Sequence, residues 1–346
     1  MTRRVASAFG LGGVLALILA MALGLGADQS WAQRISFVIA TGPTGGTYFP
    51  IGEAIAGIIS HPPGVDRCDT PGVCGPIGLI ASARTSAGAI SNVMAVNAGY
   101  VDSGLAQSDV VADAVAGKGA FRKTGALKHL RIIAALFPED VHVIVAKRAH
   151  VDSIAALRGK RVSIGDVNSG TIVTARAVLA AYGLSEWRIR ASHLPSDAAA
   201  DALDRGKLDA FFFVGGAPVG LIADLIARGR AVLLPIDGKA RERLLAANSS
   251  FSADVIAAGT YSGATATQTV SVRALWVVNE NASGDVVYGV TKALFHPLNR
   301  ALLYQSHPSA TAIRLESATD KMPAPLHPGA ARFYQEIRRP PHIDRT

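Results

Sequence analysis

The sequence predicts an α/β protein made of two lobes, and three observations support this. Short apolar runs alternate with helical patterns of about 10–15 residues along nearly the whole chain, an order typical of right-handed strand–helix–strand units with parallel strands. The alternation restarts once, shortly before residue 141. The length of 346 residues and the 49% hydrophobic content are sufficient for two cores of ordinary size.

The elements follow from the apolar patterning in chain order. In the first series the sequence predicts strands at residues 35–40, 77–85, 101–108 and 130–137, with helices at 48–60, 89–99 and 109–119. In the second series it predicts strands at 141–147, 160–165, 189–194, 208–216 and 231–236, with helices at 153–159, 169–183, 199–207 and 217–229. A long β-rich run covers 267–279, and helices follow at 285–303 and 330–339. We expect a separate sheet in each lobe.

Residues 1–32 have the layout of a secretory signal peptide. Arg3 and Arg4 precede an uncharged apolar stretch, and Ser30 and Ala32 supply the small residues of a cleavage site. We therefore expect cleavage near Ala32 and a mature protein in the periplasm. An uncleaved membrane anchor is the alternative, but the apolar core is short for a span and contains many glycines.

The charge balance is basic without being clustered. The chain has 34 Lys and Arg against 26 Asp and Glu, a net charge of +8. Because no run of Lys and Arg occurs, we expect a basic surface that aids solubility and no nucleic acid partner.

The two cysteines, Cys68 and Cys74, stand in "RCDTPGVCG". Pro71 and Gly72 between them can turn the chain so that the sulfurs meet, and export would place them in an oxidising compartment. The sequence therefore favours a local disulfide over a metal site, for which few further ligands are near.

Glycines and small hydroxyl residues gather where predicted strands give way to helices. The segments are "TGPTGGTY", "LAQSD", "GDVNSGT" and "VGGAP". Ligands of open α/β sheets bind beyond the carboxyl ends of strands, and helix N-termini there favour anions. Each segment alone is ordinary turn and capping chemistry, but their occurrence in both lobes predicts a cleft between the lobes.

Sequence motifs for catalysis are missing from these positions. "GPTGGT" lacks the dinucleotide-binding glycine pattern and the phosphate-loop lysine, and the chain has no G-x-S-x-G nucleophile elbow. The nine histidines form no compact metal-binding pattern. We therefore expect a binding protein that is not an enzyme and has no cofactor or metal.

The ordered set of motifs resembles the TAXI family of TRAP-transporter solute receptors. The resemblance begins with "IATGPTGGTYFPIGEAIAGIIS" and continues through "SGLAQSDV", "EDVHVIVAK", "LRGKRVSIG", "SGTIVTARAVLAAYGL", "GKLDAFFFVGGAP" and "LHPGAARFY". It implies a two-lobed, type II-like periplasmic binding protein with its ligand cleft between the lobes. Lobe I would comprise residues 33–138, and lobe II would comprise residues 139–262. Residues 263–346 would return through the hinge and complete lobe I.

The resemblance also implies a function and a set of ligand-binding residues. The protein would capture a small carboxylate, such as an acidic amino acid or organic acid, and deliver it as a monomer to the membrane subunits of a TRAP transporter. The alternatives are a receptor for an ATP-driven importer or sensor kinase, and an exported α/β enzyme. The implied ligand-binding residues are Gly45, Gly46, Thr47, Tyr48, Asn92, Gln107, Ser108, Ser169, Gly170, Thr171, Gly216, Ala217 and Pro218. Ala89 and Asn168 depart from the family pattern beside this set.

Four further expectations concern single residues and the hinge. We expect helix N-termini and hydroxyls to hold the carboxylate, with Arg84 and Arg273 as rival ligands whose other role is an ion pair. His327 is expected to pack against or cap the last helix. The crossings between the lobes are expected near residues 137–142 and 261–271.

Overall fold

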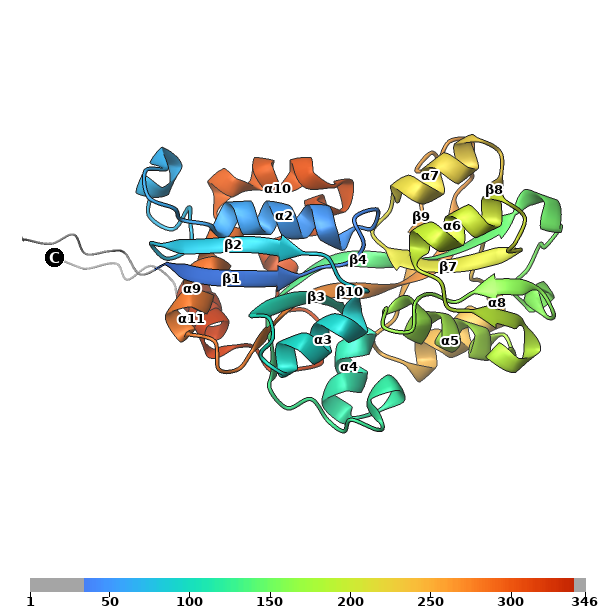
Figure 1. Cartoon of the computed structure of the whole chain (residues 1–346), viewed down its shortest axis with the longest axis horizontal. Coiled ribbons are helices and arrows are strands. Elements are labelled where there is room, and N and C mark those ends of the chain that lie inside the picture. Colours follow the sequence, from blue (N-terminus) through green and yellow to red (C-terminus); the bar gives the residue numbers. More distant parts are fainter. Residues whose placement is uncertain (1–33, 339–346) are drawn as a thin grey trace, which may run out of the picture. The chain divides into compact units, whose positions relative to one another are not determined.

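The computed structural model describes residues 34–338, in which short strands and helices alternate as the patterning predicts (Figure 1). The strands are β1 (Ile35–Ala40), β2 (Leu79–Arg84), β3 (Ser103–Gln107), β4 (Leu130–Ala146), β5 (Arg161–Ser163), β6 (Arg190–Ser192), β7 (Ala210–Gly215), β8 (Ala231–Leu234), β9 (Ser252–Ile256) and β10 (Thr267–Asn279). The helices are α2 (Tyr48–Ile59), α3 (Ala89–Asn97), α4 (Ser108–Ala116), α5 (Thr171–Ala181), α6 (Ser196–Asp204), α7 (Gly220–Ala227), α8 (Gly238–Ala247), α9 (Gly284–Leu294), α10 (Arg300–Ser306) and α11 (Pro328–Arg338). The predicted signal peptide lies outside the described residues.

The strands form one continuous sheet in the order β2-β1-β3-β10-β4-β7-β5-β6, with β8 paired to β4 and β9 to β10. The pairs β1–β2, β1–β3, β5–β6 and β5–β7 are parallel, as expected for strand–helix–strand units. We call the part built on β1–β3 lobe I and the part built on β5–β8 lobe II. The prediction of a separate sheet in each lobe was wrong, because two long strands join them.

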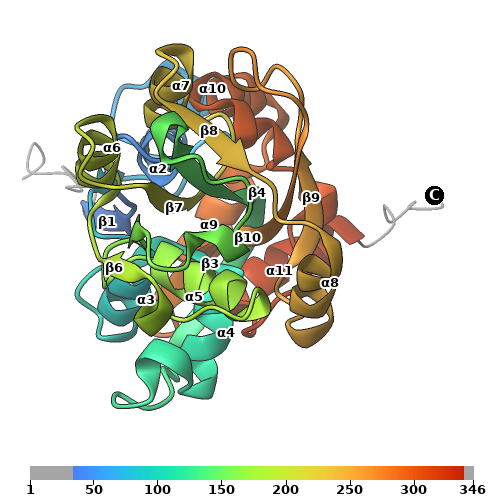
Figure 2. The same cartoon turned by 90° about the vertical axis from the view of Figure 1, so that its right-hand side faces the viewer.

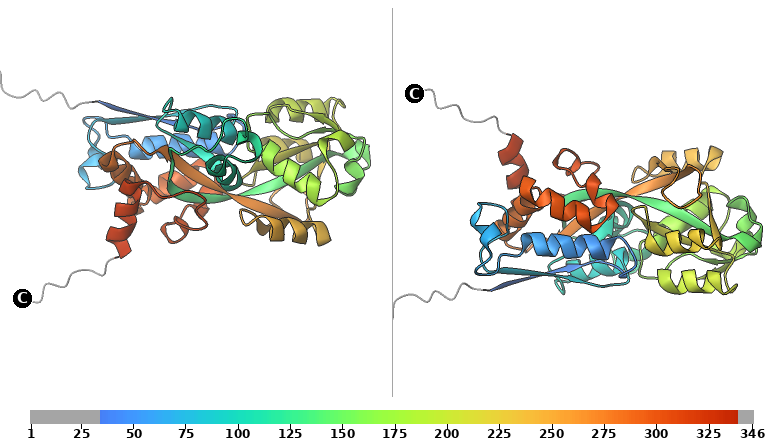
Figure 3. Two further views of the ribbon diagram at one scale, coloured as in Figure 1. Left: turned by 90° about the horizontal axis from the view of Figure 1, so that it is seen from below. Right: turned by 90° about the horizontal axis from the view of Figure 1, so that it is seen from above.

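These two strands, β4 and β10, run antiparallel and side by side between the lobes (Figure 3). One end of β4 pairs with β10 near Leu130, and its other end pairs with β7 and β8. The sequence predicted two strands here, divided at Pro138, but β4 continues through the proline. Pro138 faces Arg273 of β10 beside a register shift, which is where a strand tolerates a residue without an N–H.

Helices cover both faces of the sheet. In lobe I, α2 and α10 lie on one face and α3 and α4 on the other (Figure 1). In lobe II, α6 and α7 cover one face, and α5 and α8 the other (Figure 2). One core lies between the sheet and α3, α4, α5 and α8, and therefore extends through both lobes. The opposite face carries two cores, one under α2 and α9–α11 and one under α6 and α7.

Two local predictions are confirmed. Cys68 and Cys74 form a disulfide, and the cluster around them is small and separate from the main cores. His327 is buried, and its Nδ1 accepts a hydrogen bond of 3.1 Å from Gly329 N at the start of α11.

The predicted helix at 285–303 is interrupted, since α9 ends before His296–Pro297 and α10 begins at Arg300. Between residues 34 and 338, no helix combines the length and apolarity needed to cross a bilayer.

Candidate functional site

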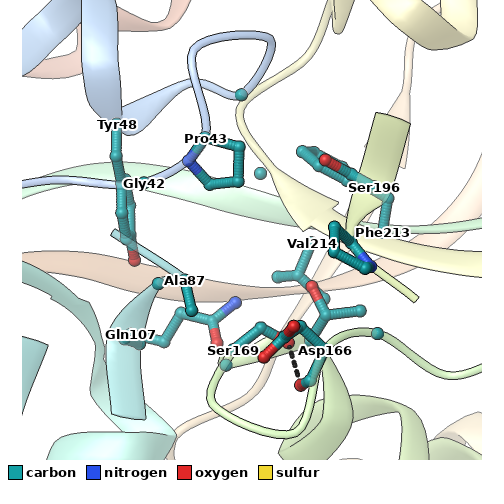
Figure 4. Close-up of a pocket in the computed structure, with 18 of the residues that line it drawn as sticks. Gly42, Pro43, Tyr48, Ala87, Gln107, Asp166, Ser169, Ser196, Phe213 and Val214 are labelled. Carbon is teal, nitrogen blue, oxygen red and sulfur yellow. Dashed lines mark hydrogen bonds between the residues drawn. The ribbon is translucent and has the colours of Figure 1, made fainter. Parts of the chain in front are cut away.

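A cavity of about 240 Å³ lies where five strand–helix junctions meet (Figure 4). The N-terminal ends of α2, α3, α4, α5 and α6 all contribute lining residues. These helices follow β1, β2, β3, β5 and β6, so the cavity lies at the carboxyl ends of the parallel strands of both lobes. Its lining comprises Gly42, Pro43, Gly46, Thr47, Tyr48, Ser86, Ala87, Gly88, Ala89, Gln107, Glu139, Gly165, Asp166, Ser169, Gly170, Thr171, Leu194, Pro195, Ser196, Phe212, Phe213, Val214 and Gly215.

Each lobe supplies one side of the cavity. Figure 4 shows Tyr48 and Gln107 entering from lobe I, with Ser169, Asp166 and Phe213 facing them from lobe II. The size suits a small solute, because pockets for drug-sized ligands are typically about 300–1,000 Å³.

Seven of the thirteen residues predicted to bind the ligand line this cavity. They are Gly46, Thr47, Tyr48, Gln107, Ser169, Gly170 and Thr171. They come from three junctions distant in sequence, so the fold brings both predicted walls together. Their contact with a ligand stays a prediction.

The other six predicted residues lie outside the cavity lining, and five of them make hydrogen bonds within the protein. Asn92 donates its side-chain amide to Thr41 O at 2.6 Å and to Leu105 O at 2.7 Å, which connects β1 to β3. Ser108 Oγ accepts from Arg273 N at 3.0 Å. Gly45 is exposed in the loop before α2.

The remaining three, Gly216, Ala217 and Pro218, form the turn after β7 that lies against lobe I. Thr47 Oγ1 donates to Gly216 O at 3.2 Å, and Ser309 Oγ donates to Ala217 O at 3.0 Å. The main-chain carbonyl groups of this turn therefore attach the rim of the cavity to lobe I.

Several hydroxyls at the cavity already donate to main-chain carbonyl groups. Thr47 donates to Gly216 O, and Ser169 Oγ donates to Asp166 O at 2.8 Å. In contrast, the Oγ of Ser196 is buried and has no hydrogen-bond partner among the described residues. The main-chain N–H groups of Gly170 and Thr171 also have no acceptor among residues 34–338. Unpaired donors at the start of a helix such as α5 are suited to an anion.

The cavity lining contains acids but no Lys or Arg side chain. Glu139 and Asp166 are its two carboxyl groups. Arg84 is exposed and Arg273 half-buried, and neither lines the cavity nor forms a salt bridge with another described residue. The expected ion pairs of these two arginines are therefore not found within the described part of the chain. Burial lowers the pKa of Arg273, an effect that Asp320 partly offsets.

Burial shifts the pKa of several groups at the inner end of the cavity. The pKa of Glu139 is raised well above its usual value, chiefly by desolvation, and the hydrogen bond from Tyr48 counteracts part of that shift. Desolvation also raises the pKa of the Tyr48 hydroxyl, and the Glu139 charge adds to this effect. Asp109, buried behind them, has a pKa raised to about 6 by desolvation.

Sequence reasoning missed Glu139 and the wall formed by Phe212, Phe213 and Val214. The signal for Glu139 was a carboxylate between two strongly apolar runs, in "LRIIAALFPEDVHVIVA". A long strand through that position buries the acid, whereas the predicted break at Pro138 would have left it in an exposed turn. The aromatic wall is the end of β7, whose apolar run was predicted only as a strand.

The chain belongs to the NMT1-like family, whose model matches residues 39–337. Solved structures with similar folds are distant in sequence. PhnD1 from Prochlorococcus marinus in complex with methylphosphonate has a TM-score of 0.51 at 11% identity, with 87% of this chain and 98% of that chain covered. A structure described as a periplasmic transporter has a TM-score of 0.51 at 13% identity, covering 87% and 92%.

A third similar structure is the alkanesulfonate-binding protein SsuA from Xanthomonas axonopodis pv. citri bound to MOPS. It has a TM-score of 0.47 at 17% identity, with 90% of this chain and 86% of that chain covered. The predicted α/β fold of a type II periplasmic binding protein is confirmed. At the family level the comparison gives the NMT1-like family.

Proposed function

We propose that this chain is an extracytoplasmic receptor that binds a small anionic solute in the cavity between its lobes and delivers it to a membrane importer. The observation that carries the proposal is the convergence of five helix N-termini on one small cavity without a cationic side chain. The N-terminal ends of helices bear partial positive charge and unpaired N–H groups, so together they can stabilise an anion without a buried cation.

The solute is proposed to be a small carboxylate, as the motif resemblance implies. PhnD1, which has the same fold, was solved with methylphosphonate, also a small oxyanion. Both classes present oxygen acceptors to N–H and hydroxyl donors, so the anionic group is the shared requirement. The periplasmic location rests on the signal-peptide pattern at the N-terminus.

Two importers are candidates for the partner. The TAXI-like motifs favour a TRAP transporter, whereas the comparisons give the NMT1-like family and a fold neighbour solved with methylphosphonate, and they support the alternative of an ATP-driven importer better. Neighbouring genes separate them, because an ATP-driven importer requires an ATPase gene beside the permease gene.

The direct test is mass spectrometry of the solute that co-purifies with the mature protein, followed by calorimetric titration of the emptied protein. A small anion bound in a one-to-one ratio is the expected result. A cationic or neutral solute, or chemical turnover of the solute, would contradict the proposal.

Replacing Thr171 with valine tests the binding side of α5. The hydroxyl of this first helical residue has no partner among the described residues and faces the cavity. If it binds a charged group of the solute, its loss should cost about 1.5–3 kcal/mol, which is roughly 10- to 100-fold in affinity. Thr171→Ser, which retains the hydroxyl, is the matched control. Unchanged affinity in Thr171→Val together with abolished binding in Arg84→Ala or Arg273→Ala would instead assign the anion to an arginine.

A further inference from the structure

Glu139 is a buried acid that lines the cavity from the middle of β4. Glu139 is only 2% exposed, and its Oε2 accepts a hydrogen bond of 2.7 Å from the Tyr48 hydroxyl. Because Tyr48 occupies Oε2, the second oxygen, Oε1, is available for another hydrogen bond. Glu139 is therefore placed at the junction of the two lobes and next to any solute in the cavity.

The surroundings of Glu139 disfavour a negative charge. Tyr48 of α2 is neutral, Asp109 at the start of α4 and Asp140 on β4 itself are acids, and Val272 of β10 is the paired residue. Lobe II contributes Asp166 to the same cavity and Thr174 of α5, whose hydroxyl donates to Asp109 Oδ2 at 2.7 Å. Among the described residues, no Lys, Arg or His forms a salt bridge with Glu139.

Burying an unpaired carboxylate is costly, so the group is more stable in its neutral form. The raised pKa of Glu139, caused first by desolvation and then by the charges of Asp109 and Asp140, agrees with this geometry. A neutral carboxyl has one O–H donor, which adds to the amide and hydroxyl donors of a cavity whose lining contains no Lys or Arg.

We propose that Glu139 is a specificity-determining residue whose neutral carboxyl group donates a hydrogen bond to the anionic solute, so that solute and proton are bound together. This inference rests on the function proposed above. The hydrogen bond would run from Oε1–H to an oxygen of the anion, while Tyr48 continues to donate to Oε2. No covalent bond changes, and the proton comes from solvent.

The sign of the pH dependence follows from this arrangement. The protonated form binds the anion, so affinity is highest below the pKa of Glu139 and falls by up to about tenfold per pH unit above it. A bound anion makes ionisation of Glu139 still less favourable and raises its pKa further. Between the free and bound pKa values, binding therefore takes up a proton.

The first experiment examines Glu139 without any solute. Infrared difference spectra of the wild-type protein and Glu139→Gln, recorded from about pH 5 to about pH 9, should show a C=O band of protonated Glu139 at neutral pH that is lost in the variant. Asp140→Asn is the matched control, because it removes a neighbouring half-buried acid that lies outside the cavity lining and whose own pKa is raised to about 7 by desolvation. That variant should retain the Glu139 band.

The second experiment titrates pyruvate and ethanesulfonate, whose single negative charges do not change over this range of pH. Cationic buffers, Tris and triethanolamine, avoid competition from phosphate or sulfonate buffers, and their different ionisation enthalpies reveal proton uptake. The wild type should bind more weakly as pH rises and should take up a proton. Glu139→Gln, whose amide also donates, should stay within about tenfold of the best wild-type affinity with a flat pH profile.

Each result distinguishes this inference from the proposed function. If the infrared band is missing at neutral pH, or if anion binding is independent of pH in the wild type, the inference fails while the receptor function stands. If Glu139→Gln abolishes binding and only amine-bearing solutes bind the wild type, Glu139 is an ionised counter-charge and the inference is also wrong. If neither anion binds at any pH, the anionic solute class of the proposed function fails.

Discussion

Gly170 is a residue at which the two lobes approach closely beside the cavity. A Cβ added to it would lie 1.6 Å from Oε1 of Gln107 and 3.1 Å from Cβ of Ala89, both of which belong to lobe I. Its φ of −74° is open to any residue, so the requirement for glycine comes from this contact and not from the backbone conformation. The absence of a side chain at Gly170 thus allows Gln107 to face the start of α5.

Gly170→Ala should weaken solute binding while leaving the fold intact. The added methyl group would displace the Gln107 amide, at an expected cost of about 1–3 kcal/mol to the closed arrangement. Calorimetric titration and a thermal melt would measure the two effects separately. Gly220→Ala at the start of α7, where a Cβ meets nothing within 4 Å, is the control and should leave affinity unchanged. Equal affinities for both variants would mean that the contact between Gln107 and Gly170 does not matter for binding.

Single residues between strands and helices were predictable, whereas a residue inside a strand was not. Gly46, Thr47, Ser169 and Thr171 lie in the loops and helix starts that follow β1 and β5, and that position brings them to the cavity. Glu139 lies at the same cavity only because β4 extends from lobe I into lobe II. Its exposure depends on pairing with strands far away in the sequence, which apolar periodicity does not reveal.

At the level of elements, α4 of lobe I and α5 of lobe II are connected by one buried hydrogen bond. Thr174 Oγ1 donates to Asp109 Oδ2 at 2.7 Å, and Val110 N donates to Oδ1 at 2.9 Å. Even with these donors, desolvation raises the pKa of Asp109 from 3.8 to about 6. The ionised form is therefore destabilised in the folded protein relative to the unfolded chain.

This shift predicts that the contribution of Asp109 to folding stability falls as pH rises from about 4 to about 6. Below this range Asp109 is protonated in both states, and above it the full cost, on the order of 3 kcal/mol, is present. Asp109→Asn should remove the cost and be more stable than the wild type near pH 8, because the amide can accept from Val110 and donate to Thr174. Urea unfolding at several pH values would measure the difference. Glu242→Gln on the exposed face of α8 is the control, and a wild-type pH profile in Asp109→Asn would refute the prediction.

The element pattern was largely predictable because most strands are short and flanked by glycine or proline. The long strand β4 was the main exception, since Pro138 usually ends a strand. Its neighbour β10 compensates with a shift in register near Arg273 and Leu275, and pairing continues on both sides. Such compensation arises between two strands more than a hundred residues apart, so neither strand alone indicates it.

For the whole molecule, β4 and β10 join the two lobes, and we expect the lobes to move about these two strands. The expected crossings near residues 137–142 and 261–271 coincide with the middle of β4 and the start of β10. Around the cavity, the lobes also meet through hydrogen bonds, including Ser91 N to Asn168 O at 3.1 Å. If the lobes open as we predict, these contacts must break while β4 and β10 bend.

Solution scattering should therefore detect compaction on binding. The emptied protein should have a larger radius of gyration than the protein saturated with its co-purified solute, because hinge closure brings the lobes together. Thr174→Val removes one contact between the lobes and should expand the empty protein further while the saturated protein still closes. Superimposable profiles at saturation and without solute would contradict a closing cleft.

The position of β10 also constrains the order in which the chain can fold. In the sheet β10 lies between β3 and β4, although it follows them by more than a hundred residues in sequence. Until β10 is in place, β3 and β4 present facing edges without their shared partner. Lobe I therefore cannot complete its sheet before residues 267–279 pair with both strands, so a chain truncated before β10 would lack the centre of the sheet.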